Sequence, residues 1–306
     1  MSERVGLVVE GETLSIEYRF IDGLRIGSAP QPLVVFLHEG LGSVAMWKDF
    51  PDRLCAAGGF RGLVYSRPGY GRSTPRPRDV KWRPDFMHVQ ARLVLPALLD
   101  ALDIDVRVDG SSDPPWLFGH SDGGSIALIY AASFPDRVAG LVLLAPHMFV
   151  EQEGLDSIIA VQKTWLHGDL RDKLARHHDD VESAFWGWND IWLDPAFRSW
   201  NIEALLPAIA CPVLAIQGRD DRYGTMAQID RIASALPRTE LLKLDRCGHS
   251  PHRDRPDAVI AATVHFVTEN SAAASGSAMN RAFESSSAPA SASASQPRKH
   301  IIKETT

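Results

Sequence analysis

The sequence predicts an α/β fold, with a mostly parallel central sheet, flanking helices and an inserted helical cap. This prediction depends on two observations. Short β-branched runs alternate along the chain with longer stretches of helical period, which is the pattern of parallel strands joined by crossover helices. One long interior segment, residues 148–205, departs from that alternation.

The expected strands begin with an antiparallel hairpin. Residues 5–9 and 14–20 both alternate polar and apolar side chains, and Glu10-Gly11-Glu12 lies between them. Six later runs are mostly apolar, as expected for strands that are buried on both faces of a parallel sheet. These runs are residues 33–37, 62–65, 116–118, 141–144, 212–217 and 240–244.

The expected helices cover this sheet and build the cap. Residues 86–102 and 124–132 carry apolar residues at three and four spacing, and residues 257–267 are expected to form the last core helix. The sequence therefore divides into a first core part (1–147), a cap (148–205) and a second core part (206–270).

Within the cap, residues 157–166 and 170–185 have helical patterns and no buried strand is evident. His177-His178-Asp179-Asp180 is interpreted as a solvated helix face rather than a metal site, because adjacent helical residues point about 100° apart. Five of the eight tryptophans lie in the cap: Trp165, Trp186, Trp188, Trp192 and Trp200.

Composition restricts the partners. A formal charge of -6 leaves no surplus of positive charge for nucleic acid or for an anionic membrane surface. No apolar run approaches the roughly 20 residues of a membrane helix, and Met1-Ser2-Glu3-Arg4 begins no signal peptide. We therefore expect a cytoplasmic monomer or homodimer that acts on a small molecule. The three cysteines have no metal-ligand spacing, which favours free thiols, and residues 271–306, rich in Ser and Ala, are expected to form a disordered tail.

The chemistry begins at Gly119-His120-Ser121-Asp122-Gly123, a G-x-S-x-G motif that directly follows one predicted strand and precedes a helix. In this context the glycines permit a sharp turn that exposes the serine hydroxyl at the helix N-terminus, which predicts Ser121 as a nucleophile. A serine hydroxyl needs a base to take its proton. His249 follows the last predicted strand and precedes the final helix, so it is the predicted base, ahead of its neighbour His252.

A carboxylate must hold that base in the correct tautomer. Gln217-Gly218-Arg219-Asp220-Asp221-Arg222 supplies two candidates after a predicted strand. We favour Asp221 and keep Asp220 as the alternative. No metal or cofactor is required by this set of residues.

Together these motifs resemble the α/β-hydrolase superfamily, specifically its capped esterase and carbon-carbon hydrolase branch, over about residues 10–268. His38-Glu39-Gly40-Leu41-Gly42 is similar to the family's oxyanion loop, and Ser66-Arg67-Pro68-Gly69-Tyr70-Gly71-Arg72-Ser73 to the loop after the next strand. The resemblance implies that Gly40, or second Leu41, and Asp122 offer backbone N–H groups to an oxyanion.

Two positions depart from the family pattern. Glu39 stands where glycine is usual, and its carboxylate either points outward as a surface charge or reaches the pocket. Asp122 stands where an apolar residue is common, and its charge is interpreted as capping the helix.

The cap is expected to set the substrate. His147, at the end of a predicted strand, and the tryptophans Trp186, Trp188 and Trp192 are candidate substrate contacts, although tryptophans at helical spacing equally suit packing of the cap on the core. A serine hydrolase of a carboxylic ester or lactone with a small apolar or aromatic substrate is the first hypothesis. A thioester or vinylogous-dione carbon-carbon hydrolase with the same triad is the second, and a slow-turnover ligand receptor on the same fold is the third.

Overall fold

The computed structural model describes residues 2–22, 31–104 and 114–286 of the chain. Its centre is an eight-stranded sheet in the order β1-β2-β4-β3-β5-β6-β7-β8. The strands are β1 (Glu3–Val9), β2 (Glu12–Ile21), β3 (Leu33–Leu37), β4 (Arg61–Tyr65), β5 (Trp116–His120), β6 (Gly140–Leu144), β7 (Val213–Gly218) and β8 (Thr239–Leu244). β1 and β2 form the expected antiparallel hairpin, β2 pairs antiparallel with β4, and every pair from β4 to β8 is parallel. The predicted fold class is confirmed.

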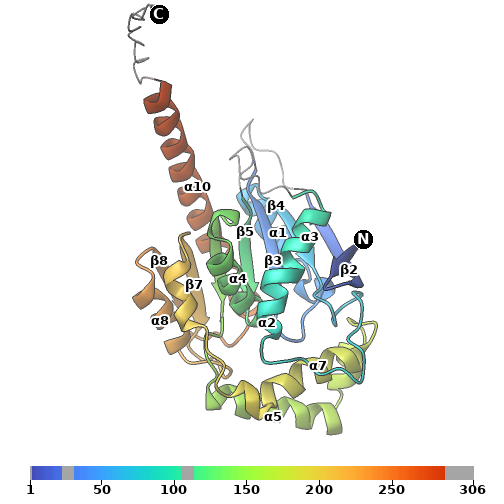
Figure 1. Cartoon of the computed structure of the whole chain (residues 1–306). Helices are drawn as coiled ribbons and strands as arrows, with labels where there is room; N and C mark the ends of the chain where they lie inside the picture. The colour runs from blue at the N-terminus through green and yellow to red at the C-terminus, as the bar shows by residue number, and fades with distance from the viewer. Residues whose placement is uncertain (1, 23–30, 105–113, 287–306) are drawn as a thin grey trace, which may run out of the picture.

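Helices cover both faces of the sheet (Figure 1). On one face lie α2 (Phe86–Val89), a π-helical turn (Gln90–Val94), α3 (Leu95–Ala101), α4 (Asp122–Ser133) and α8 (Ala227–Ala235), and on the other lie α1 (Phe50–Gly58) and α10 (Pro256–Ser286). Alternate residues of one strand face the two cores: Val35 and Leu37 pack with the first set of helices, and Val34 and Phe36 with the second. This alternation is why the central strands are apolar on consecutive residues.

The chain between β6 and β7 is fully described, and it contributes helices and no strand of the sheet. These are α5 (Gln152–His167), α6 (Leu170–Leu174) and α7 (Val181–Leu193), followed by short 3-10 turns at Pro195–Phe197 and Glu203–Ala208. Figure 1 shows α5 and α7 at one end of the sheet, opposite the end from which α10 projects. The remaining short elements are α9 (Pro251–Asp254) and the 3-10 turns Val44–Trp47 and Pro135–Arg137.

Three expectations about helices differ from the structure. Residues 86–102 are not one regular α-helix, because Pro96 has no N–H to offer and a π-helical turn precedes it. Residues 170–185 form two helices, with a break before Asp180, whose side chain caps α7 by accepting the N–H of Ser183. α10 continues through Ser286 rather than ending near Val267, in keeping with the helix propensity of its alanines. Residues 287–306 of the expected tail lie outside the described residues.

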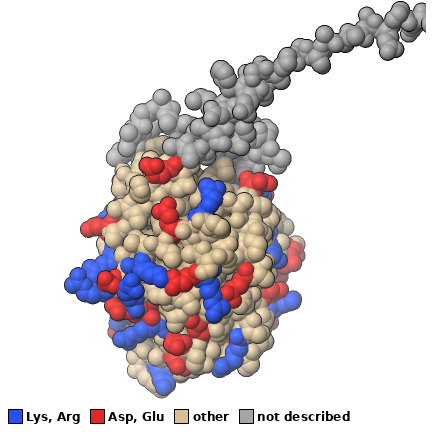
Figure 2. Space-filling model, turned by 90° about the vertical axis from the view of Figure 1, so that its left-hand side faces the viewer, with Lys and Arg blue, Asp and Glu red and all other residues tan. Residues whose placement is uncertain are grey.

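On the face that Figure 2 shows, acidic and basic side chains are interspersed, so no patch of a single charge sign is evident there. Within the described residues, no helix has both the length and the apolar character needed to cross a membrane.

Close contact between main chains joins α4 to the sheet. A Cβ atom at Gly123 would collide with the backbone carbonyl of Leu37 in β3, and one at Gly119 would collide with the backbone carbonyl of Gly123. Main chain therefore packs on main chain at this point. The colliding atoms belong to the backbone, so no side-chain rotation could relieve the collision.

We expect Gly123→Ala to destabilise the protein by about 1–3 kcal/mol or more, the usual cost of overpacking a core. Gly6→Ala, in β1, is the matched control because a Cβ there meets nothing within 4 Å. Chemical denaturation of the two variants measures the difference, and an equally small change in both would contradict the packing argument.

Candidate active site

Ser121 occupies the sharp turn between β5 and α4. Its backbone adopts φ 53° and ψ -119°, an uncommon conformation for a residue with a side chain. The Ser121 N–H donates to the carbonyl of Leu144 at 2.9 Å, which holds the turn against β6. The side chain is thereby lifted above the sheet at the N-terminus of α4, as the motif predicts.

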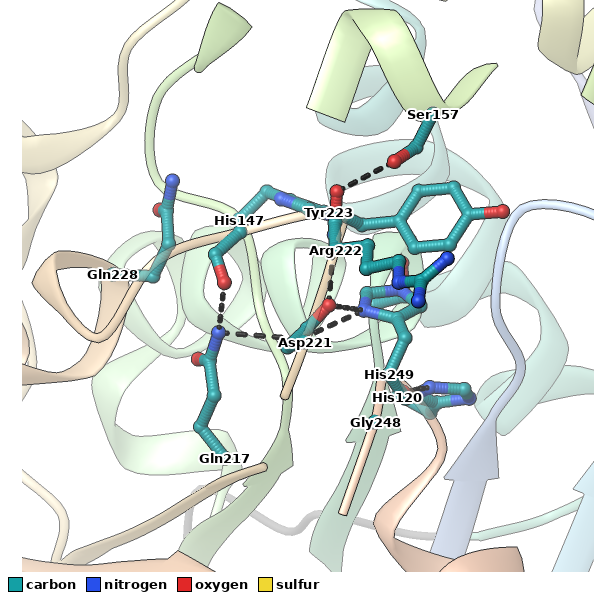
Figure 3. Close-up of polar contacts among 12 residues, drawn as sticks. His120, His147, Ser157, Gln217, Asp221, Arg222, Tyr223, Gln228, Gly248 and His249 are labelled. Atoms are coloured by element: carbon teal, nitrogen blue, oxygen red, sulfur yellow. Dashed lines mark hydrogen bonds and ion pairs between the residues drawn. The ribbon is translucent and has the colours of Figure 1, made fainter. Parts of the chain in front are cut away.

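The three residues expected to form a triad come together in the expected order. His249 Nε2 lies 2.9 Å from Ser121 Oγ, and His249 Nδ1 lies 3.0 and 2.9 Å from the two carboxylate oxygens of Asp221. Figure 3 shows Asp221 between Gln217 and His249, with the ring of Tyr223 against the imidazole. This arrangement can carry a proton from the serine hydroxyl to the imidazole.

Asp221 is held as an ionised acceptor. Its oxygens also accept hydrogen bonds from the N–H of Tyr223 at 2.8 Å and from Gln217 Nε2 at 3.2 Å. Burial alone would raise its pKa, but the hydrogen bond and charge of His249 and the N–H of Tyr223 outweigh burial and lower the pKa. Asp220, by contrast, is exposed and makes no contact with His249. The geometry thus favours Asp221 over Asp220 as the orienting acid.

Hydrogen bonds from His38 and Arg67 fix the loop after β3. His38 Nε2 accepts the N–H of Arg67 at 3.0 Å, so Nδ1 carries the proton and donates to the carbonyl of Glu39 at 2.6 Å. The same carbonyl accepts from Arg67 Nη2 at 2.9 Å and from the N–H of Gly42 at 3.0 Å. Three donors on one oxygen fix the orientation of the Glu39–Gly40 peptide. Gly40, Leu41 and Asp122 all line the cavity above Ser121, as the predicted oxyanion positions require.

His178, in the segment between α6 and α7, contacts this loop. His178 Nδ1 accepts the N–H of Gly71 at 2.9 Å, which leaves the proton on Nε2, and Nε2 lies 3.0 Å from the carbonyl of Leu41. The interpretation of His178 as part of a solvated helix face is therefore wrong: its side chain is buried and joins two core loops. No group of three or more His, Cys, Asp or Glu side chains in the described part of the chain could hold a metal ion.

Asp122 is also more than a helix cap. Its side chain is fully buried, accepts from Trp192 Nε1 at 3.2 Å and lies 3.7 Å from Arg67 Nη2. Asp122 does lie in the first turn of α4, as the capping interpretation expects, but no side chain caps this helix with a hydrogen bond, and the Asp122 carboxylate contacts Trp192 and Arg67 instead. Burial raises the pKa of Asp122, and Arg67 and Trp192 oppose that shift.

The Glu39 carboxylate could point outward or reach the pocket, and in the structure it reaches the pocket. Glu39 lines the cavity and 22% of its side chain is exposed. Its carboxylate Oε2 lies 3.5 Å from Nδ1 of the buried His120. Contact with His120 lowers the Glu39 pKa well below its usual range although burial opposes the shift.

A cavity of about 360 Å³ contains the triad and extends under the helices between β6 and β7. His147, Trp188 and Trp192 line it, and burial lowers the pKa of His147 to about 3, so this imidazole is neutral. Trp188 also covers Gly40, where a Cβ would collide with the indole. Trp186 does not line this cavity. Its indole donates to Glu182 at 2.9 Å on another side of α7, so the expectation of a substrate contact is corrected at this position.

Several supporting residues escaped sequence reasoning, namely Arg67, His120, His178 and Tyr223. Their roles depend on contacts between segments far apart in the chain. Arg67 and His120 do lie within motifs that resemble those of the family, but the motifs do not indicate these contacts. Cys55, Cys211 and Cys247 are free thiols as expected.

Comparison with known proteins identifies the family, because the model of the α/β hydrolase family matches residues 34–262. The chain belongs to the α/β hydrolase family. It is 26% identical over 262 residues to a 2-hydroxy-6-oxononadienedioate/2-hydroxy-6-oxononatrienedioate hydrolase of Dechloromonas aromatica, an alignment that covers 77% of this chain and 86% of that protein. It is 29% identical over 254 residues to a putative carbamate hydrolase of Pseudomonas savastanoi pv. phaseolicola, covering 76% and 92% of the two chains.

Solved structures of the same fold include a thermophilic esterase from Thermogutta terrifontis, with a TM-score of 0.66, 20% identity and coverage of 88% of this chain and 99% of that one. Another is the enol-lactonase from Burkholderia xenovorans LB400, with a TM-score of 0.62, 24% identity and coverage of 86% and 99%. These similarities confirm the fold, and with the family match they make the chain a hydrolase of the α/β hydrolase family.

We predict that Asp221→Asn lowers kcat by about 10⁴, as loss of the orienting carboxylate does in a serine triad. Asp220→Asn should change kcat less than about threefold, as expected of a surface substitution away from the site. Steady-state kinetics on both variants compare two adjacent carboxylates, and the reverse ranking would transfer the role to Asp220.

The protonation of His178 should limit stability in acid. Burial lowers its pKa to about 4, against 6.5 for an unperturbed histidine. A base with a depressed folded pKa stabilises the fold fully above pH 6.5 and loses that contribution as the pH falls toward 4. We expect Tm to fall over this window, and less steeply in His178→Asn than in the wild type. His177→Asn, in the same segment, should change the slope less, because burial lowers the pKa of this partly exposed histidine too but to a smaller extent. An unchanged pH slope in His178→Asn would contradict the assignment.

Proposed function

We propose that this protein is a serine hydrolase that cleaves a carboxylic ester or lactone of a small, mostly apolar substrate through an acyl-enzyme. The observation that carries the proposal is the hydrogen-bonded series Ser121–His249–Asp221 at distances of 2.9 to 3.0 Å, on a turn at the N-terminus of a helix. Hydrogen-bond distances between nucleophile, base and orienting acid are the signature of an activated serine.

In this mechanism Ser121 Oγ attacks the acyl carbonyl while His249 Nε2 accepts its proton. The resulting imidazolium is stabilised by Asp221 and returns the proton to the leaving alkoxide. Water then attacks the acyl-enzyme with His249 again as base, which releases the acid and restores the serine. All proton transfers use groups of this chain and water.

The oxyanion of each tetrahedral intermediate would be held by the backbone N–H groups of Asp122 and Gly40. The N–H of Asp122 is at the start of α4, where no carbonyl within the helix can accept it. Two carboxylates, those of Glu39 and Asp122, flank this region and oppose a developing negative charge. Arg67 offsets the charge of Asp122, because its guanidinium lies 3.7 Å from that carboxylate. It also donates a hydrogen bond to the backbone carbonyl of Glu39.

The cavity favours an uncharged substrate. Most of its lining side chains outside the triad are aliphatic or aromatic, among them Leu41, Met46, Ile158, Val161, Leu170, Leu174, Trp188 and Trp192. Among the described residues that line it, Arg253 is the one with a permanent positive charge, against the carboxylates of Glu39 and Asp122. A volume of about 360 Å³ lies at the small end of ligand sites.

Carbon-carbon bond hydrolysis is the second candidate, and the curated relative from Dechloromonas aromatica, named for a dienedioate substrate, favours it. The same triad serves both reactions. The lining of this cavity argues against a dicarboxylate, since Arg253 is its one permanently positive side chain among the described residues and most of the remaining wall is apolar. A slow ligand receptor would keep the same triad, so turnover decides between it and an enzyme.

The test combines a fluorophosphonate probe with matched substrates. We expect labelling of Ser121, steady turnover of neutral 4-nitrophenyl butyrate and phenylacetate, and kcat/KM at least about tenfold lower for the anionic hemisuccinate, equivalent to about 1.4 kcal/mol. Ser121→Ala should remove labelling and lower kcat by about 10⁴ to 10⁶. Labelling of another residue would overturn the assignment, a burst without turnover would favour a receptor, and faster loss of a 2-hydroxy-6-oxodienoate chromophore would favour the carbon-carbon hydrolase.

A further inference from the structure

His120 connects three loops of the site. It is the last residue of β5 and precedes Ser121 directly. Its Nε2 lies 2.6 Å from the backbone carbonyl of His249, and Figure 3 shows its ring beside the chain that carries the catalytic base. Its Nδ1 lies 3.5 Å from the carboxylate of Glu39. One side chain thus contacts the loops of the proposed nucleophile, base and oxyanion hole.

Both contacts of this ring are with acceptors. A backbone carbonyl accepts hydrogen bonds and donates none, so Nε2 carries a proton. An ionised carboxylate also only accepts, and a neutral imidazole that is protonated on Nε2 would present a lone pair to it. Nδ1 is buried and forms no conventional hydrogen bond with any described residue, so in a neutral ring it would be an uncompensated polar atom facing a charge.

We propose that His120 is an imidazolium paired with Glu39, and that it acts as a positioning residue which holds the carbonyl of His249. With protons on both nitrogens, each acceptor meets a donor. The charge of Glu39 is balanced, and the carbonyl of the catalytic base receives a charge-assisted hydrogen bond. This inference rests on the proposed triad for its kinetic effect, although the protonation state does not depend on turnover.

The groups around the pair support this distribution of charge. His252 packs 4.9 Å from the His120 ring, and burial lowers its pKa far enough to keep it neutral. His147 is neutral for the same reason, and the ring of His249, at 5.3 Å, is engaged by Asp221. Among these imidazoles, His120 is therefore left as the partner of Glu39, 3.5 Å from its carboxylate, in agreement with the lowered pKa of that carboxyl.

The pair has a mechanical consequence. The Glu39 backbone is already fixed by His38 and Arg67, so a pairing of its side chain with His120 fixes the His249 backbone relative to the oxyanion loop. The catalytic imidazole then keeps its distance from both Ser121 and the oxyanion site. Small displacements of such groups are costly, since a misplacement of about 1 Å can reduce a rate about 10²-fold.

The first test reads the protonation state directly. Imidazole ¹⁵N NMR of the full-length protein at pH 7.5, assigned with His120→Asn, should show both His120 nitrogens protonated. In Glu39→Gln the amide can donate to Nδ1, so Nδ1 should lose its proton while Nε2 keeps it. A neutral His120 ring in the wild-type protein would overturn the proposal, whether or not the protein hydrolyses esters.

The second test is a double-substitution cycle on a neutral ester. Glu39→Gln and His120→Asn should each lower kcat about 10- to 100-fold with little change in KM. The double variant should be no worse than His120→Asn alone, because the two residues act as one unit. Losses that multiply would overturn the pairing.

The matched control is His252→Gln, which alters a buried imidazole of the same cluster that has no hydrogen bond to Ser121, Asp221 or His249. Its kcat should stay within about threefold of the wild type, with Tm measured for all variants. A loss of kcat equal to that of His120→Asn would show a general packing effect and overturn a specific role for His120.

Discussion

Contact between main chains, where α4 lies against β3 and β5, is the constraint on which the site depends. Gly119 and Gly123 allow an approach that a side chain would block. Ser121, between them, adopts a positive φ that a regular strand or helix does not. The close approach therefore brings the serine hydroxyl, the first N–H groups of α4 and the end of β3 to one place. The hydroxyl then lies 2.9 Å from His249 Nε2, which the loop after β8 supplies.

The sequence could predict this part of the molecule because its signals are local. Runs of apolar residues marked the central strands to within two residues at either end, and the motif around Ser121 required two glycines at fixed positions. The order of strand ends also placed Ser121, Asp221 and His249 on one edge of the sheet. The choice of Asp221 over Asp220 was less secure, since adjacent residues differ only in direction until the loop is built.

Other features depended on contacts that no local pattern carries. An aspartate in the first turn of a helix suggests a cap, yet the Asp122 side chain is buried and contacts Arg67 and Trp192. His178 sits among charged residues that suggest a solvated surface, yet it is buried between two loops. Trp186 and Trp188 are two positions apart and point to different sides of α7, so aromatic content alone could not say which one faces the cavity.

The bridge formed by His178 has a further consequence for how the molecule works as a whole. This residue belongs to the segment between α6 and α7, and it bonds simultaneously to Gly71 and to the carbonyl of Leu41. Any displacement of that segment from the core would break both bonds in one step and leave the N–H of Gly71 and the carbonyl of Leu41 without this partner. The helices between β6 and β7 and the loop of the proposed oxyanion site are thereby joined through a single imidazole, so the position of one depends on the position of the other.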